Sequence, residues 1–121
     1  MTTTRQRGQH WERVAESFLN KRGLKTLQRN FQVRCGEIDL ILMDEGTLVF
    51  TEVRYREHGE YGTGAESVTW TKQKRIISAA QLFLQRHPKQ SFRPCRFDVI
   101  SIGTENGETL LNWIQDAFDA G

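Results

Sequence analysis

Apolar and polar positions recur with two different periods along the chain, and the changes of period delimit the predicted elements. In residues 10–22 the apolar side chains recur every three or four positions, which predicts a helix that ends at Gly23. A second run with the helical period covers residues 71–87, and Pro88 stops it. Between them, residues 24–35, 37–44 and 47–56 are typical of strands, and we expect an irregularity near Arg29 and Asn30.

Turn signals connect these segments and complete the predicted order. Glu45-Gly46 predicts a tight turn between the second and third strands, and the glycines of residues 57–66 predict a mobile loop. After the second helix, residues 96–102 are typical of a strand, and Asn106-Gly107 predicts a turn into a short strand at 109–114 with a frayed tail at 115–120. The order αβββαββ predicts a single α+β domain in which two helices flank a sheet.

Length, charge and cysteine content narrow the class of protein. A chain of 121 residues with a formal net charge of +2 is long enough for one core and is mildly basic, which permits a polyanionic partner without requiring one. Cys35 and Cys95 are far apart and in no metal-ligand spacing, so we expect two ordinary thiols in a reduced cytoplasmic protein. The N-terminal residues lack an apolar segment and no apolar run approaches about 18 residues, so we expect neither export nor a membrane span.

Four charged residues interrupt the apolar central strands and are the candidate site. Glu37 and Asp39 lie in the second predicted strand, and Glu52 and Arg54 lie in the third. Carboxylates in such apolar runs are costly to ionise unless a metal, a cation or hydrogen bonds compensate them. A two-residue loop between the strands places Asp39 opposite Glu52, and Glu37 opposite Arg54. A three-residue loop turns Asp39 to the other face.

Two chemical interpretations of this group remain open from the residues alone. With a two-residue loop, the Cβ atoms of Asp39 and Glu52 lie within about 4.5–5.5 Å of each other. A hard dication such as Mg²⁺, or Mn²⁺ in its place, suits two such carboxylates and polarises a phosphodiester, while Arg54 neutralises transition-state charge. The alternative is purely structural: a cross-strand salt bridge between Glu37 and Arg54, with the other two acids satisfied by backbone donors or lysines.

Three segments carry a resemblance to a known family. Residues 36–41 (GEIDLI), 48–56 (LVFTEVRYR) and 96–100 (RFDVI) resemble the small bacterial family called YraN or UPF0102. That family is related to archaeal Holliday-junction resolvases and to the restriction-endonuclease-like PD-(D/E)xK nucleases. The resemblance extends from about residue 8 to residue 102. It implies a restriction-endonuclease-like mixed sheet with flanking helices, a divalent-metal site and a nucleic-acid substrate.

The resemblance also implies roles for individual residues. Asp39 matches the metal-binding Asp of the nuclease pattern, and Glu52 matches the Glu of its ExK element. Glu12 resembles the first-helix Glu that completes the acidic cluster of the resolvases as a metal ligand. Arg54 stands where the pattern has Lys. A guanidinium keeps the charge and a bidentate grip on phosphate, but it is never a neutral base in a protein.

Further basic and aromatic residues lie near these segments in sequence. Lys72, Lys74 and Arg75 begin the second helix, where cations oppose the helix dipole, so we expect this end to face phosphate. Lys72 or Lys74 can supply the lysine that is absent at position 54. Arg56 belongs to a scattered basic surface suited to backbone contacts. For Trp70 we favour a core or hinge anchor over stacking on unpaired bases.

Two other groups of polar residues receive structural assignments. We expect Asp98 to pair with a neighbouring basic residue and to be structural. The three histidines, His10, His58 and His87, are too dispersed for a metal site, and we expect them at the surface.

These observations favour one function over two others. The leading hypothesis is a Mg²⁺- or Mn²⁺-dependent endonuclease that hydrolyses phosphodiester bonds of DNA, branched DNA such as a Holliday junction included. The alternatives are a non-catalytic nucleic-acid-binding module with a degenerate nuclease site, and a protein adaptor that uses the sheet edge. By analogy with resolvases, which cut a symmetric junction twice, the nuclease hypothesis includes a homodimer.

Overall fold

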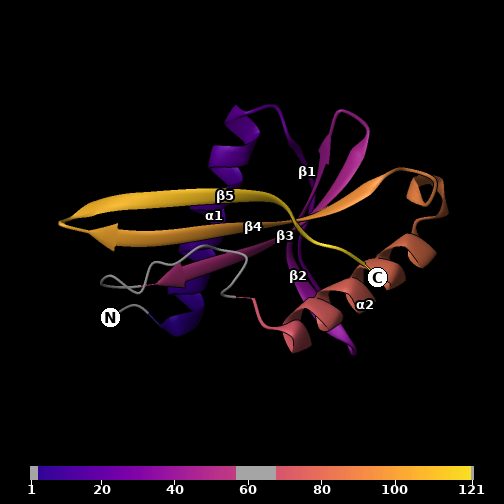
Figure 1. The fold of residues 1–121 in the computed structure, drawn as a ribbon, viewed down its shortest axis with the longest axis horizontal. Coiled ribbons are helices and arrows are strands. Elements are labelled where there is room, and N and C mark those ends of the chain that lie inside the picture. The colour runs from indigo at the N-terminus through magenta and orange to yellow at the C-terminus, as the bar shows by residue number, and fades with distance from the viewer. Residues whose placement is uncertain (1–2, 57–67, 121) are drawn as a thin grey trace.

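The structure is a computed structural model that describes residues 3–56 and 68–120, and its strands form one twisted sheet between two helices (Figure 1). The predicted mobile loop at 57–66 lies outside the described residues. In chain order the elements are α1 (Thr4–Lys21), β1 (Lys25–Val33), β2 (Gly36–Asp44), β3 (Thr47–Arg56), α2 (Trp70–Arg86), a short 3₁₀ turn η2 (Pro88–Gln90), β4 (Cys95–Glu105) and β5 (Glu108–Phe118). The predicted order αβββαββ is therefore confirmed, and so is the mixed sheet with flanking helices.

Helix α1 begins earlier than its apolar period predicted. Thr3 forms a capping box with Gln6, in which the Thr3 hydroxyl accepts from the Gln6 amide and the Gln6 side chain accepts from the Thr3 amide. Polar residues fill the first turns, so the apolar pattern could not detect them. At the other end Gly23 adopts φ +95°, and the Leu24 amide donates to the Leu19 carbonyl, which terminates the helix as predicted.

The strands follow their sequence order β1-β2-β3-β4-β5 across the sheet. Strands β3 and β4 are parallel and are connected through α2, whereas the other neighbours are antiparallel. The turn between β2 and β3 has two residues, Glu45 and Gly46, because Asp44 pairs with Thr47. Both turn residues have positive φ, +48° and +94°, as a type I′ hairpin requires. This register is the one that brings Asp39 next to Glu52.

Each face of the sheet carries its own apolar core. Towards α2, Phe50 packs with Phe83 and Phe97 in edge-to-face and stacked contacts. Towards α1, Leu19 packs with Leu40, Val49 and Ile100. Strand β4 is buried over most of its length because it contributes side chains to both cores.

At the predicted irregularity in β1, the side chains of the strand change from one face of the sheet to the other. Asn30 has φ +50°, and residues on its two sides face opposite helices: Arg29 binds Glu16 of α1, whereas Phe31 packs against Phe83 of α2. The facing strand does the same, since Ile38 belongs to the α2 core and Leu40 to the α1 core. Asp39 therefore lies at a crossover between the two faces.

Strand β5 is longer than the sequence predicted, and the prediction of a frayed tail at 115–120 is wrong. The strand continues to Phe118 through an irregularity in its pairing with β4 and a positive φ of +52° at Asp116. Two tertiary contacts hold this extension: the Asp116 amide donates to Asp98 (3.0 Å), and Phe118 stacks on Phe97.

The structure describes the state of both cysteines and the character of both helices. Cys35 and Cys95 are both free and exposed. Within the described residues, neither helix combines the length and the apolar character that a membrane crossing demands.

Candidate functional site

Asp39 and Glu52 form the centre of the site, where β2 and β3 stop pairing through their backbones. The Oδ2 atom of Asp39 accepts a hydrogen bond from the Val53 amide (2.8 Å). The pairing of Leu40 with Thr51 puts Asp39 and Glu52 at the next positions of the two strands. Glu52 is only 3% exposed, whereas Asp39 is partly exposed, so the buried acid of the pair is Glu52.

The pKa of Asp39 is shifted by its burial and by its acidic neighbours. Burial, followed by the charge of the Glu52 carboxylate, raises the pKa of Asp39 well above its usual range, and Glu12 adds to the rise. The hydrogen bond from the Val53 amide opposes the rise without cancelling it. The acid pair is therefore poorly compensated as an anion.

Lys72 at the start of α2 is the cation that meets the acid pair. Its Nζ lies 2.6 Å from Oε2 of Glu52. That oxygen is buried and still lacks an aligned hydrogen bond, so Lys72 neutralises it at ion-pair distance without the directional contact of a hydrogen bond. Helix α2 reaches this position because it packs tightly on β2, where a Cβ at Gly36 would clash with the Arg75 carbonyl.

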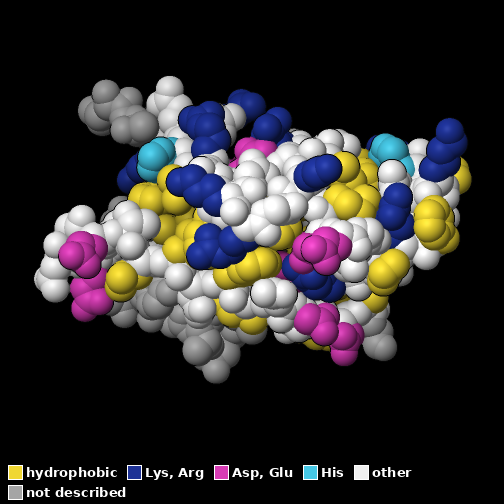
Figure 2. Space-filling view, turned by 90° about the horizontal axis from the view of Figure 1, so that it is seen from above, with side chains coloured by type: hydrophobic (Ala, Val, Ile, Leu, Met, Phe, Trp, Pro, Cys, Tyr) yellow, Lys and Arg dark blue, Asp and Glu magenta, His cyan; other side chains and the backbone are white. Residues whose placement is uncertain are grey.

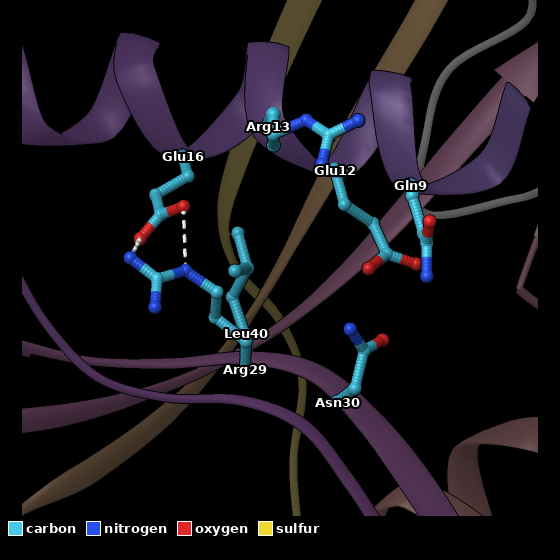
Figure 3. Close-up of a pocket in the computed structure, with 7 residues that line it drawn as sticks. All are labelled: Gln9, Glu12, Arg13, Glu16, Arg29, Asn30 and Leu40. Carbon is cyan, nitrogen blue, oxygen red and sulfur yellow. Dashed lines mark hydrogen bonds and ion pairs between the residues drawn. The ribbon is translucent and has the colours of Figure 1, made fainter. Parts of the chain in front are cut away.

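Glu12 approaches the same acids from α1. It lines a cleft of about 310 Å³ with Gln9, Glu16, Arg29 and Asn30, and its carboxyl group points towards the Asn30 amide (Figure 3). Burial raises the pKa of Glu12, the facing Asn30 amide lowers it, and the charges of Glu37 and Glu52 raise it further. Glu12 is thus electrostatically linked to the acid pair.

The described residues do not assemble a complete set of protein ligands for a metal. Within 3–56 and 68–120, no group of three or more His, Cys, Asp or Glu side chains is placed to hold one ion. Asp39 and Glu52 remain as a two-carboxylate pair, the number that Mg²⁺ commonly takes from a protein when water and phosphate complete its shell. The donor chemistry therefore fits Mg²⁺ or Mn²⁺, with Glu12 further out.

The other predicted residues lie around this centre. Arg54 shares a face of β3 with Glu52 and is partly buried, and Arg56 follows on the same face. Among the ion pairs between described residues, none joins Arg54 to Glu37. Glu37 is exposed, and its side-chain hydrogen bond among the described residues is a long one from Gln32 (3.4 Å). The proposed Glu37–Arg54 salt bridge is absent from this structure.

The structural alternative nevertheless accounts for part of the geometry. It expects Asp39 to be satisfied by a backbone donor and Glu52 by a lysine, and the Val53 amide and Lys72 fill these two roles. These partners do not offset the burial of Asp39 and the charge of the Glu52 carboxylate, which together raise the pKa of Asp39. The Val53 amide and Lys72 therefore compensate the negative charge of the acid pair only in part.

The basic residues at the start of α2 surround the site from outside. Lys74 and Arg75 are exposed, and Arg75 lines a pocket together with Lys72 and Glu37. Elsewhere the positive charge is dispersed: Figure 2 shows Lys and Arg side chains spread over one face, with fewer acidic ones among them. The scattered basic surface expected from the sequence agrees with this view.

The expectations for Trp70 and Asp98 have opposite outcomes. Trp70 is 69% exposed, so the expectation that it anchors the core or a hinge is wrong. Asp98 is buried and pairs with Arg96 (3.1 Å), which confirms its structural assignment. Of the histidines, His10 and His87 are exposed as expected, and His58 lies outside the described residues.

Sequence reasoning missed one buried polar network beside the site. Glu16 is 8% exposed and accepts hydrogen bonds from Arg29 (2.9 Å) and Thr26 (2.6 Å), which fastens α1 to β1. These partners outweigh burial and lower the pKa of Glu16. The signal was the spacing of Glu12 and Glu16, which puts both acids on one helix face.

Asp39→Asn is expected to stabilise the protein at pH 8 and to change its stability little at pH 4. The raised pKa means that the folded state binds the Asp39 proton more tightly than the unfolded state, whose pKa is about 3.9. Stability therefore falls as pH rises from about 4 through the raised pKa, and the amide removes this cost while keeping an oxygen for the Val53 amide. Urea unfolding at several pH values checks it.

The exposed Glu108→Gln at the β4–β5 turn is the control, because Glu108 and the residue opposite it, Glu105, are both exposed, in contrast to the buried Glu52 beside Asp39. If Asp39→Asn destabilises the protein equally at pH 4 and pH 8, the crowding of the acid pair is not a stability cost.

The chain is similar to curated proteins that carry the name UPF0102. The model of the family described as "Uncharacterised protein family UPF0102" matches residues 11–102. A UPF0102 protein of Alcanivorax borkumensis is 51% identical over 112 residues, which cover 92% of this chain and 90% of the relative. One from Nitrosococcus oceani is 47% identical over 96% of this chain and 94% of the relative, and one from Pseudomonas syringae is 45% identical over 98% of both. The matched range, residues 11–102, spans the positions of Glu12, Asp39, Glu52 and Lys72.

Proposed function

This chain belongs to the UPF0102 family, and from the site that its fold assembles we propose that it is a divalent-metal-dependent endonuclease acting on DNA. The observation that carries the proposal is an imbalance of charge. Asp39 and Glu52 act on each other as like charges and Glu12 adds to this effect, whereas the ion pairs among the described residues include one cation at this group, Lys72 at Glu52. A hard dication is the partner that would relieve this excess, and nucleic-acid phosphates complete its shell.

Each residue has a distinct role in this proposal. Asp39 and Glu52 would hold Mg²⁺ or Mn²⁺, and Glu12 would orient a water. A divalent ion supplies Lewis acidity and makes a water more acidic. Lys72 and Arg54 neutralise negative charge that develops on the phosphate in the transition state. Arg56, Lys74 and Arg75 contact flanking phosphates, which positions the strand without reading its sequence.

Lys72 can supply the ammonium group that is missing where Arg54 replaces the lysine of the nuclease pattern. The nuclease pattern needs a lysine beside the acids, and here the ammonium comes from α2 instead of β3, at 2.6 Å from Glu52. Arg54 is then free to act as a phosphate clamp, for which a guanidinium is better suited than an ammonium.

Metal binding tests the proposal before any turnover is measured. Calorimetric titration with Mg²⁺ and Mn²⁺ is expected to show binding by the wild type, loss of binding in Asp39→Asn, and unchanged binding in the control Glu108→Gln. Purified protein with Mn²⁺ is then incubated with linear, branched and single-stranded DNA. If the wild-type protein binds neither metal, the proposed nuclease activity is refuted.

A non-catalytic nucleic-acid-binding module is the second candidate, and two observations favour it. Lys72 already neutralises Glu52, and the described residues lack a three-ligand metal group. Salt-dependent DNA binding without metal binding or cleavage would support this candidate. Both candidates place the protein in the cytoplasm, where its two free cysteines stay reduced, and a homodimer would fit a symmetric branched substrate.

Lys72→Gln is expected to lower the rate of metal-dependent cleavage about 100-fold, because removing one charge-stabilising donor from a buried site costs about 10²–10³ in rate. The double variant with Arg54→Lys is expected to recover part of the rate by returning a lysine to β3. Metal affinity is expected to stay equal or to increase, because the competing ammonium is gone. Single-turnover cleavage and calorimetry give the two readouts. Unchanged cleavage would remove Lys72 from the mechanism.

A further inference from the structure

Trp70 is the one tryptophan that the fold does not use internally. Trp11 stacks on Tyr55 with ring centroids 4.2 Å apart, and the Trp113 indole donates to buried Asp98 (2.9 Å). Trp70, the first residue of α2, is 69% exposed. The exposed ring is therefore available for a contact outside the fold.

The charge around Trp70 indicates the chemistry of that contact. The Lys74 ammonium lies 3.9 Å from the centre of the Trp70 ring, and no acidic residue occurs in the first turn of α2. Beside it, a pocket of about 220 Å³ is lined by Lys72 and Arg75 together with the hydroxyl-bearing Thr69 and Thr71, with Glu37 as its one acid. An aromatic ring among cations suits an anionic ligand that carries its own aromatic ring, such as a nucleotide.

Lys72 connects this surface to the acid pair. Its ammonium touches Glu52, and the same side chain lines the pocket at the helix start. Successive helix residues are about 100° apart, so Trp70 and Lys72 project to different sides of the helix end. A nucleic-acid strand with one phosphate at the acid pair therefore has to pass over Thr69 and Thr71 before one of its bases reaches Trp70. The stacked base belongs to a neighbouring nucleotide and not to the one that is cut.

We propose that Trp70 is a stacking platform for an unpaired base, with Lys74 and Arg75 binding the adjoining phosphates, so that the site selects single-stranded or branched nucleic acid. A base inside a duplex is covered by its neighbours, whereas an unpaired base can lie on an aromatic ring. The inference rests on the proposed function for its substrate, and it goes further by naming the residue that discriminates between strand structures.

Binding measured in EDTA tests the platform without involving cleavage. Fluorescence anisotropy is recorded for a labelled 20-nucleotide single strand, a four-way junction and a blunt duplex. Trp70→Ala is expected to weaken single-strand binding about 5- to 150-fold, the range for losing one stacked base, and to change duplex binding little. Trp70→Phe is expected to retain most of the affinity. Quenching of tryptophan fluorescence by the single strand is expected in the wild type and absent in Trp70→Phe, although Trp11 and Trp113 remain.

Phe92→Ala is the matched control, because Phe92 is an equally exposed ring (76%) away from the acid pair. The proposal is overturned if Trp70→Ala binds all three nucleic acids like the wild type, if it loses single strand and duplex equally, if Phe92→Ala shows the same loss, or if the wild type binds none of them. If Trp70→Ala still cleaves DNA with metal and binds nucleic acid with unchanged affinity, only the stacking role of Trp70 is refuted. Trp70-dependent binding without any cleavage would refute the nuclease alone.

Discussion

Glu52→Gln is expected to lower metal-dependent DNA cleavage by about 10³-fold or more while the protein stays folded. The amide matches the carboxylate in shape but removes one of the two anionic ligands, and a metal contributes several kcal/mol of transition-state stabilisation, with each factor of ten worth about 1.4 kcal/mol. Lys72 then faces a neutral group instead of its counter-charge. Initial rates are measured with Mn²⁺ and excess protein on linear and branched DNA, beside Glu108→Gln as the control.

Two companion measurements separate chemistry from binding. DNA affinity of Glu52→Gln in EDTA is expected to equal or exceed that of the wild type, because a negative charge has been removed from the path of the phosphates. Thermal unfolding confirms that the variant is folded. Cleavage that persists in both Glu52→Gln and Asp39→Asn would point to a contaminating nuclease and would end the proposal.

The register of the central hairpin could be predicted from the sequence because it depends on local chemistry. Glycine tolerates the positive φ that the second position of a type I′ turn requires, and Gly46 supplies it. Once the loop has two residues, the period of the strand places Asp39 beside Glu52. The sequence also predicted the irregularity near Asn30, although not that the chain turns over there and leaves Asp39 at the crossover of the two faces.

The partner of Glu52 could not be chosen from the sequence, since it depends on how one helix packs across the sheet. Lys72 and Lys74 were equally available to fill the place of the missing lysine. The close approach of α2 to Gly36 directs Lys72 to Glu52, whereas Lys74 lies against Trp70. Trp70 was misassigned for a related reason: the periodicity of a helix does not reveal whether its first residue meets the core or the solvent.

The end of β5 escaped prediction because its contacts are far away in sequence. Residues 115–118 have no strong strand pattern of their own, and the fold extends the strand through the bond between the Asp116 amide and Asp98 on β4. Local propensity is overridden wherever a buried acceptor offers such a bond. Asp98 thus determines a piece of structure that its sequence neighbourhood only hinted at.

Asp98→Ala is expected to lower the free energy of unfolding by about 3–5 kcal/mol, the usual cost of removing one partner from a buried ion pair. The Asp98 side chain is 0% exposed and accepts from Arg96, from the Trp113 indole (2.9 Å) and from the Asp116 amide (3.0 Å). Its loss leaves the last two donors without an acceptor and Arg96 with Asp44 alone (3.0 Å). Equilibrium unfolding in urea measures the change.

Two milder variants show whether the network or the charge alone is responsible. Asp44→Ala removes the more exposed partner of Arg96, whose side chain is 27% exposed, so a loss of about 1 kcal/mol or less is expected, as for surface ion pairs. Asp98→Asn keeps one carbonyl oxygen for Trp113 or the Asp116 amide and is expected to fall between the two. If Asp98→Ala costs no more than Asp44→Ala, the buried network does not hold β5 on β4, and the extension of that strand must have another cause.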